Sequence, residues 1–173
     1  THRAGLSYGI FAGDPVSGEY LRRQTDFNTH DGPLSEVCER LATMPLVFDP
    51  GERWHYSVSL DVLGRVIEVV SGKTLDQYFR DHIFEPLEMH DTSFQVTADK
   101  KDRLTALYTK TADERMKLTE TAEESLWADE SNPVTCFSGG SGLVGTMADY
   151  WKFVEMLRGQ GQGSNGARIL GSR

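Results

Sequence analysis

The amino-acid sequence predicts a mainly α-helical fold with one small β element. Four segments repeat apolar residues at helical spacing, over about residues 34–43, 58–71, 74–85 and 146–157. Two shorter runs, at 104–109 and 116–119, alternate weakly in the manner of strands. The length of 173 residues is ordinary for one domain. We therefore expect a single helical unit over residues 1–173, whose Gly-rich end, residues 159–173, forms an exposed connector.

The first part of the chain is expected to contain little regular structure. Residues 1–33 are rich in Gly, Ser, Asp and Thr and have only short apolar runs, which favours an irregular segment lying over the core. The segment that follows predicts a short helix over 34–43, because Leu34, Val37 and Leu41 share one helical face. Pro45 lies just beyond its end.

The segment after the turn at residues 49–51 predicts a central, buried helix. Its apolar stripe contains Val58, Val62, Leu63, Val66, Ile67 and Val70. Gly72 follows as a C-terminal stop, and Thr74 is in position to cap the next helix, which ends before Pro86. We expect the two helices to form an antiparallel hairpin. The predicted inner face of the second helix is Leu75, Tyr78, Phe79 and Ile83.

The second half of the chain predicts a small hairpin, a glycine-rich turn and a last helix. The hairpin joins the two alternating runs, and the turn occupies Ser138–Gly142. Thr146 and Asp149 resemble a helix-capping pair, so we expect a helix through about Leu157 that Gly159 ends. Its predicted inner face is Tyr150, Phe153, Val154 and Leu157.

The composition argues against several classes of partner and site. The net charge is −8 and the basic residues are dispersed, which disfavours nucleic acid. No apolar run approaches the roughly 20 residues that cross a bilayer. Cys38 and Cys136 lack Cys-x-x-Cys spacing, so we expect buried thiols, and the histidines form no ligand pattern. We expect neither a metal nor another cofactor, and nothing in the sequence indicates a cellular compartment.

Three catalytic motifs can be tested and rejected. Gly72-Lys73-Thr74 lacks the earlier glycine of a phosphate-binding loop, since residue 67 is an isoleucine. Ser138 and Ser141 lie among glycines, but neither has glycine both two residues before and two residues after it. No serine of the chain has a lysine three residues on. If the protein is an enzyme, its nucleophile must lie elsewhere.

Tyr56 is the strongest candidate for a reactive side chain. It lies between the Pro50-Gly51 turn and the start of an apolar helix, where a phenol can be held rigidly near a pocket for proton transfer. The alternative is a structural tyrosine that packs its ring at the helix entrance and bonds a carbonyl. Residue spacing alone leaves both open.

Several short motifs together point to a known family. They are Thr1–Leu6, Pro50-Gly51 before Tyr56-Ser57, Asp61–Gly64, Glu68–Gly72, Pro86–Met89, Asp91–Phe94 and Gly139–Leu143. With these motifs, which cover nearly the whole chain, the sequence resembles the serine β-lactamase-like superfamily. The nearest branch is the class C-like esterases, or family VIII carboxylesterases.

The resemblance implies a fold that pairs an α/β domain with a mostly helical domain, with the active site between them. This chain resembles the helical domain alone and lacks most of the α/β domain. It opens at Thr1 without an initiator Met, so we expect a piece of a longer protein. The nucleophilic Ser and its Lys are then expected before Thr1. The Lys-Thr-Gly motif, or its Trp- or His-Gly-Gly variant, is expected after Arg173.

The resemblance also assigns roles to residues. The tyrosine of the family's Tyr-x-Asn motif maps onto Tyr56, which would accept the serine proton. It would need the positive charge of the Lys nearby, because a phenol of ordinary pKa, about 10, is a poor base at neutral pH. Val58 replaces the Asn that helps hold lactam or peptidyl substrates, which favours esters. Substrate contacts are expected from Trp54, Ser59 and Ser141. Ser59 can instead cap the helix, and Asp61 can simply favour the helix dipole.

We therefore expect the tyrosine-bearing part of a serine hydrolase that acts on small acyl esters through an acyl-serine intermediate. A β-lactamase or D-alanyl peptidase of the same fold is the close alternative, and a noncatalytic binding or regulatory protein is the alternative of another class. The expected partners are a small ester or lactam substrate and the α/β domain. The chain by itself is expected to be inactive and to self-associate through an uncovered apolar surface lined by Trp54, Tyr56 and Gly139–Leu143.

Overall fold

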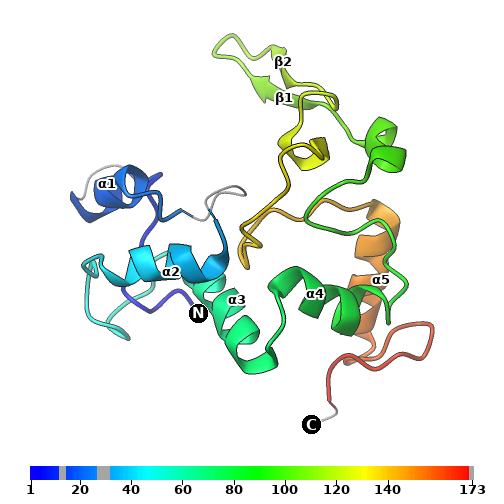
Figure 1. The fold of residues 1–173 in the computed structure, drawn as a ribbon, viewed down its shortest axis with the longest axis horizontal. Coiled ribbons are helices and arrows are strands. Elements are labelled where there is room, and N and C mark those ends of the chain that lie inside the picture. The colour runs from blue at the N-terminus through cyan, green and yellow to red at the C-terminus, as the bar shows by residue number, and fades with distance from the viewer. Residues whose placement is uncertain (12–14, 27–31, 172–173) are drawn as a thin grey trace.

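The computed structural model describes residues 1–11, 15–26 and 32–171. Over these residues the fold is helix-rich with one two-stranded sheet, as the sequence predicts (Figure 1). The elements are α1 (Pro15–Arg22), α2 (Leu34–Ala42), α3 (Ser59–Ser71), α4 (Leu75–Phe79), the π-helical turn η1 (Arg80–Phe84), the 3₁₀ turn η2 (Ala98–Arg103), β1 (Leu107–Lys110), β2 (Met116–Glu120), the 3₁₀ turn η3 (Leu126–Ala128) and α5 (Met147–Arg158). In the described part of the chain no helix is long and apolar enough to cross a membrane.

The prediction of an irregular N-terminal segment is wrong for α1. This helix begins at Pro15, whose fixed φ suits the first helical position. It has no clear apolar stripe and is anchored by Tyr20, which is fully buried in the main core. Tertiary packing, rather than periodicity, therefore explains α1. Residues 12–14 and 27–31 of this segment lie outside the described residues.

Two apolar clusters hold the chain together. The main cluster joins α1, α2, the start of α3 and α4, and its buried members are Tyr20, Leu34, Val37, Leu41, Met44, Val58, Leu75, Phe94, Val134 and Cys136. The smaller cluster joins η1 and the loop after it to α5 through Phe84, Leu87, Met89 and Met156. The side chain of Cys136 is buried and that of Cys38 is partly buried.

Helix α3 has the predicted bounds and only part of the predicted buried face. Val58 is fully buried and Val62 and Ile67 pack partly buried against the main core, whereas Leu63 and Val66 are exposed and Val70 is 83% exposed. The fully buried residues within the helix are Asp61 and Gly64. A Cβ added to Gly64 would lie 2.9 Å from a methyl carbon of Leu75. Close approach to neighbouring segments therefore selects the face with small residues, and much of the apolar stripe remains uncovered.

Helices α4 and α5 also begin where predicted. On the predicted inner face of the α4 segment, Leu75 is fully buried and Phe79 and Ile83 pack partly buried against the apolar clusters. Thr74 occupies the N-cap position of α4 without a side-chain cap bond, and the π-helical turn that follows shifts the helical register so that Phe84 is buried. In α5 the Thr146 side chain accepts the Asp149 N–H, and Gly159 ends the helix.

The predicted inner face of α5 is wrong in part. Tyr150 and Leu157 are exposed, while Asp149 and Met156 are buried. The Asp149 carboxylate accepts hydrogen bonds from the Asp91 N–H (2.7 Å) and the Thr92 hydroxyl (3.0 Å). These bonds turn the face that bears Asp149 and Met156 inward.

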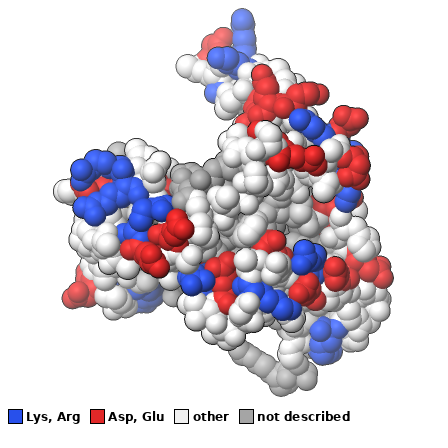
Figure 2. All heavy atoms as spheres, in the orientation of Figure 1, with Lys and Arg blue, Asp and Glu red and all other residues white. Residues whose placement is uncertain are grey.

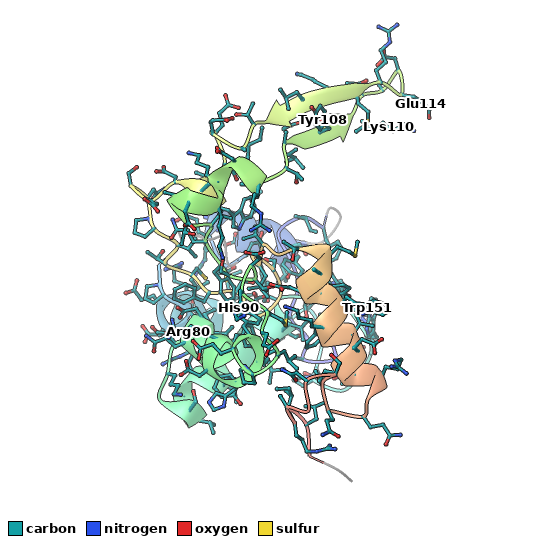
Figure 3. All side chains as sticks on the ribbon, turned by 90° about the vertical axis from the view of Figure 1, so that its right-hand side faces the viewer. Arg80, His90, Tyr108, Lys110, Glu114 and Trp151 are labelled. Carbon is teal, nitrogen blue, oxygen red and sulfur yellow. The ribbon has the colours of Figure 1, made fainter. Side chains whose placement is uncertain are left out.

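The hairpin of β1 and β2 projects from the rest of the molecule (Figures 1 and 3). The strands are antiparallel, with Tyr108 opposite Leu118 and Lys110 opposite Met116, and all their residues except Glu120 are exposed. At the other end of the chain, residues after α5 form a loop closed by a bridge between Gln162 and Arg168. The hairpin of β1 and β2 corresponds to the two alternating runs, 104–109 and 116–119, that the sequence predicts as strands.

Candidate active site

The loop that carries Tyr56 is fixed to the N-terminal segment by backbone hydrogen bonds. The His55 N–H donates to the His2 carbonyl at 2.8 Å, and the Gly51 N–H donates to the Arg3 carbonyl at 2.8 Å. Gly51 has φ of +91°, a conformation that suits glycine at this turn. The chain therefore enters α3 from a loop that is fixed along its length.

The ring of Tyr56 packs between two other aromatic rings. Its centroid lies 4.7 Å from that of His2 and 5.3 Å from that of Tyr8, and the two tyrosine rings are stacked at 25°. His2 is itself held in place, because its Nδ1 accepts the Ser57 N–H at 3.2 Å. Tyr56 nevertheless remains 43% exposed. The arrangement fixes the ring and leaves part of the side chain accessible.

Tyr8 connects Tyr56 to a buried carboxylate. The Tyr8 hydroxyl donates to Asp61 Oδ2 at 3.5 Å. Burial is the main cause that raises the pKa of Tyr8, and the nearby Asp61 and Tyr56 raise it further. Tyr8 therefore stays protonated at neutral pH and serves as a neutral ring beside Tyr56 rather than as a base.

Asp61 links α3 to the glycine-rich segment. It is 1% exposed, and its Oδ1 accepts hydrogen bonds from the Ser138 hydroxyl and from the Gly140 N–H, the latter at 3.2 Å. Burial raises the pKa of Asp61, while the hydrogen bonds from Ser138 and Gly140 oppose the shift. A Cβ on Gly139 would lie 2.3 Å from the Leu60 carbonyl oxygen, so only glycine allows this approach.

The predicted substrate-binding residue Ser141 belongs to this same segment. Its N–H donates to Ser138 Oγ at 2.9 Å, and the two hydroxyl oxygens are 3.2 Å apart. Ser138 in turn bonds Asp61. Ser141 is exposed, and so its hydroxyl can reach a ligand.

Ser59 and Trp54 join the site on its other side. The N-cap of α3 is Val58, so Ser59 is the first helical residue, and it makes no capping bond; its Oγ lies 2.6 Å from Ser57 Oγ. Trp54 is exposed, and its ring meets His2 edge-on with the centroids 6.2 Å apart. The structure therefore links Tyr56, Trp54, Ser59 and Ser141 through one network. Their catalytic and binding roles remain predictions.

Three residues of this network had no clear role in the sequence. His2 and Tyr8 carry no periodic signal, although His2 lies in the Thr1–Leu6 motif. Asp61 can be explained by the helix dipole alone, and only its burial shows that it ties α3 to Ser138 and Gly140. The sequence offers only an acid in the first turn of a helix and a distant Ser-Gly-Gly, and neither feature by itself predicts their contact.

A serine–histidine pair near the site does not form a nucleophile. Ser7 Oγ lies 3.0 Å from His55 Nε2 and 2.7 Å from Ser17 Oγ. Both serines are fully buried. The pair therefore fixes the N-terminal segment against α1 and the Tyr56 loop, and it cannot reach a substrate.

In Figure 2, basic groups gather on the left of the face, over α1, acidic groups gather at the upper right, below the β1–β2 hairpin, and both signs mix along the lower part of the face. Within the described residues no group of three or more His, Cys, Asp or Glu is arranged to hold a metal ion.

The network around Tyr56 offers a fixed phenol, hydroxyl groups and backbone N–H groups. These groups suit proton transfer and hydrogen bonding to a substrate.

The chain matches a known protein family and is similar to several bacterial proteins. The model of the family described as Beta-lactamase matches residues 1–172. An uncharacterized protein from Mycobacterium tuberculosis is 33% identical over 170 residues, which are 98% of this chain and 40% of that protein. Esterase EstB from Burkholderia gladioli is 31% identical over 169 residues, covering 91% of this chain and 43% of the esterase.

Among solved structures, EstCE1, described as a hydrolase with promiscuous acyltransferase activity, aligns with a TM-score of 0.74 and 30% identity. The alignment covers 96% of this chain and 45% of EstCE1. The chain thus spans less than half the length of each of these similar proteins.

Proposed function

The chain belongs to the beta-lactamase family, and from this we propose that it is the helical, tyrosine-bearing part of a serine hydrolase that acts on small acyl esters through an acyl-serine intermediate. The serine and its lysine come from the rest of the full-length protein, because no serine of this chain has a lysine three residues on. By itself the chain is inactive, because Tyr56 supplies one member of a three-part catalytic unit.

The observation that carries the proposal is the way in which Tyr56 is held. Its ring is fixed between His2 and Tyr8, and the contact with Tyr8 leads through Asp61 to the glycine-rich segment. A general acid–base group must lie within hydrogen-bonding reach of the proton that it moves, and such fixation favours that geometry. Tyr56 also remains partly exposed, as proton exchange with a bound substrate requires.

In the proposed reaction, the serine oxygen attacks the ester carbonyl carbon while its proton passes to the phenolate of Tyr56, which the lysine cation stabilises. The C–O bond to the alcohol then breaks, and the phenol returns the proton to the leaving oxygen. Water repeats the sequence on the acyl-serine and releases the acid. Backbone N–H groups stabilise the oxyanion in both steps.

The environment of Val58 favours esters over lactams. The family places an amide-bearing Asn two residues after the tyrosine, where it helps to hold lactam and peptidyl substrates. Here Val58 lacks an amide, and its side chain is fully buried in the main core. This position therefore offers no hydrogen bond to a substrate. The similarity to Esterase EstB supports the same choice.

Acyl transfer to an alcohol is the second candidate. In that reaction an alcohol replaces water in the second half of the sequence, with no change in the role of Tyr56. EstCE1, which is 30% identical to the chain, is described as a hydrolase with promiscuous acyltransferase activity. This similarity favours acyl transfer as the second candidate.

The proposal is tested with the full-length protein and with the chain alone. We expect the full-length protein to hydrolyse p-nitrophenyl acetate and butyrate and to leave the lactam nitrocefin essentially intact, while the chain alone hydrolyses neither. Addition of a short alcohol to the ester assay tests for acyl transfer through formation of a new ester. Rapid nitrocefin turnover with slow ester turnover would instead identify a β-lactamase, and no turnover of either would favour a noncatalytic protein.

A further inference from the structure

A cavity of about 580 Å³ lies between α5 and the segment of α4 and η1. Figure 3 shows α5, which carries Trp151, beside the η1 turn, which carries Arg80. The cavity extends to residues 143–147, which connect the glycine-rich segment to α5. Its large apolar walls are Phe79, Ile83, Phe84, Met89, Leu143 and Phe153.

The chemistry of the walls suits an apolar occupant. No charged side chain lines the cavity. Three hydroxyl groups line the cavity, those of Thr92, Thr146 and Tyr150. The Thr92 hydroxyl donates to the Asp149 carboxylate at 3.0 Å, and the Thr146 hydroxyl accepts the Asp149 N–H at 3.2 Å, so both threonines hold the start of α5. Tyr150 is 63% exposed, so its phenol can keep its contact with solvent. Burial of a hydrocarbon group here costs little desolvation of polar atoms.

Two other cavities have charged side chains in their walls. One, of about 430 Å³, has Arg80 and Glu85 in its walls, and another, of about 200 Å³, has Lys100 and Arg103. A hydrocarbon chain would have to lie beside charged groups in either of them. The uncharged cavity is thus the better site for an apolar ligand.

The apolar cavity also begins close to the candidate active site. Leu143, one of its walls, follows Ser141 by two residues, so their Cα atoms are at most about 7 Å apart. The intervening segment is held in place, since the Trp127 indole N–H donates to the Gly142 carbonyl at 3.1 Å. Val144 exchanges two backbone hydrogen bonds with Ser93, at 2.9 and 3.0 Å. A ligand beside Ser141 therefore has a fixed apolar cavity within reach.

We propose that this cavity binds the hydrocarbon chain of the ester substrate, so that the protein prefers esters with a medium-length chain to acetates. The inference rests on the proposed function, because Ser141 is part of the site only if the esterase assignment holds. The chain can belong to the acyl group or to the alcohol, since both would offer the same methylene groups to the cavity.

The test uses the full-length protein and two ester series. One varies the acyl group, as p-nitrophenyl acetate, butyrate and octanoate, and the other varies the alcohol, as ethyl, butyl and octyl acetate. In the series whose chain enters the cavity, kcat/KM should rise about fourfold per buried methylene. The other series should stay nearly flat, which identifies the source of the chain.

A pair of neighbouring variants locates the effect. Met147 lines the cavity and is 82% exposed, so Met147→Asp places a carboxylate at the rim without disturbing a core. Ala148→Asp adds the same charge one residue further along α5, outside the cavity lining. We expect Met147→Asp to lower the preference for octanoate over acetate, or octyl over ethyl, by at least about tenfold. Ala148→Asp should leave the preference unchanged.

Failure of this inference can be told apart from failure of the proposed function. Flat chain-length profiles in an active esterase, or equal effects of the two variants, would overturn the cavity assignment and leave the esterase intact. If no ester is hydrolysed, calorimetric binding of decanoate to the full-length protein decides. Binding weakened by Met147→Asp and not by Ala148→Asp supports the cavity. Absent binding, or binding to the isolated chain alone, shows that the cavity does not serve a ligand in the full protein.

Discussion

At the level of single residues, the carboxylate of Asp61 connects the two sides of the candidate site. It accepts hydrogen bonds from Tyr8, which stacks on Tyr56, and from Ser138 and Gly140 of the glycine-rich segment. Buried polar groups are stable only when such partners are present, so the loss of Asp61 leaves donors without an acceptor.

We predict that two substitutions of Asp61 separate its hydrogen bonding from its titration. Asp61→Ala should lower the free energy of unfolding by about 1–3 kcal/mol, because buried donors lose their acceptor. Asp61→Asn keeps an amide oxygen and cannot titrate. Burial raises the pKa of Asp61 above its ordinary value of 3.8. Its stabilising contribution is therefore complete below pH about 3.8 and is lost as the pH rises through the higher folded-state pKa.

The measurement is urea unfolding of the wild type and Asp61→Asn at about pH 3.5 and pH 7. The unfolding free energy of the wild type relative to Asp61→Asn should fall as the pH rises. A relative value that rises with pH would mean that hydrogen bonding outweighs burial and that the folded-state pKa is lowered.

For Tyr56, we predict that Tyr56→Phe in the full-length protein lowers kcat for p-nitrophenyl butyrate by about 10²- to 10⁴-fold, with little change in KM. The substitution keeps the ring between His2 and Tyr8 and removes only the proton-transfer group. Tyr108→Phe on the distant hairpin is the matched control and should leave kcat unchanged. An unaltered kcat in Tyr56→Phe would remove this residue from the mechanism.

At the level of elements, α4 and α5 show that the same residue type can occupy an N-cap with and without capping. Thr146 accepts the Asp149 N–H, whereas Thr74 makes no side-chain cap bond although its backbone is extended. Helix start signals in the sequence locate both boundaries correctly, but only side-chain geometry distinguishes the two caps.

We accordingly predict unequal effects of two Thr→Ala substitutions. Thr146→Ala should lower the free energy of unfolding by about 1 kcal/mol, because the first turn of α5 loses its cap. Thr74→Ala should change it by less than about 0.5 kcal/mol, since no cap bond is lost. Thermal or urea unfolding of both variants checks the difference. Equal losses would contradict the assignment of a working cap to Thr146 alone.

At the level of the whole molecule, several apolar side chains of α3 have no cover. Leu63, Val66, Val69 and Val70 are all exposed. Soluble monomers rarely expose contiguous apolar patches larger than a few hundred Å². We interpret this face as a surface that the rest of the full-length protein covers.

We therefore predict that the isolated chain self-associates. Its weight-average mass from light scattering should rise with concentration, and Val66→Lys with Val70→Lys should suppress the rise, because lysine keeps the helix and removes the apolar face. Met116→Lys with Leu118→Lys places the same charges on the exposed hairpin and is the matched control. A chain that is monomeric at all concentrations would show that this face is not an orphaned interface.

The sequence by itself determined the positions of α2, α3, α5 and the hairpin, together with the stops at Gly72 and Gly159. These features depend on apolar periodicity, caps and glycine conformations within a few residues of each other, so they can be predicted locally. The same local reading placed Tyr56 at the entrance of α3, and the motifs spread over the chain indicated the family that the comparisons confirm.

Only the tertiary structure decided which faces are buried and which side chains meet. The buried face of α3 depends on Asp61 bonding Ser138, 77 residues away, and that of α5 on Asp149 bonding Asp91, 58 residues away. α1 depends on the burial of Tyr20, and the π-helical turn on the packing of Phe84. Such contacts join residues whose separation in the sequence carries no periodic signal. A helix that is apolar on most sides can bury any of several faces, and the choice belongs to the segments that pack against it.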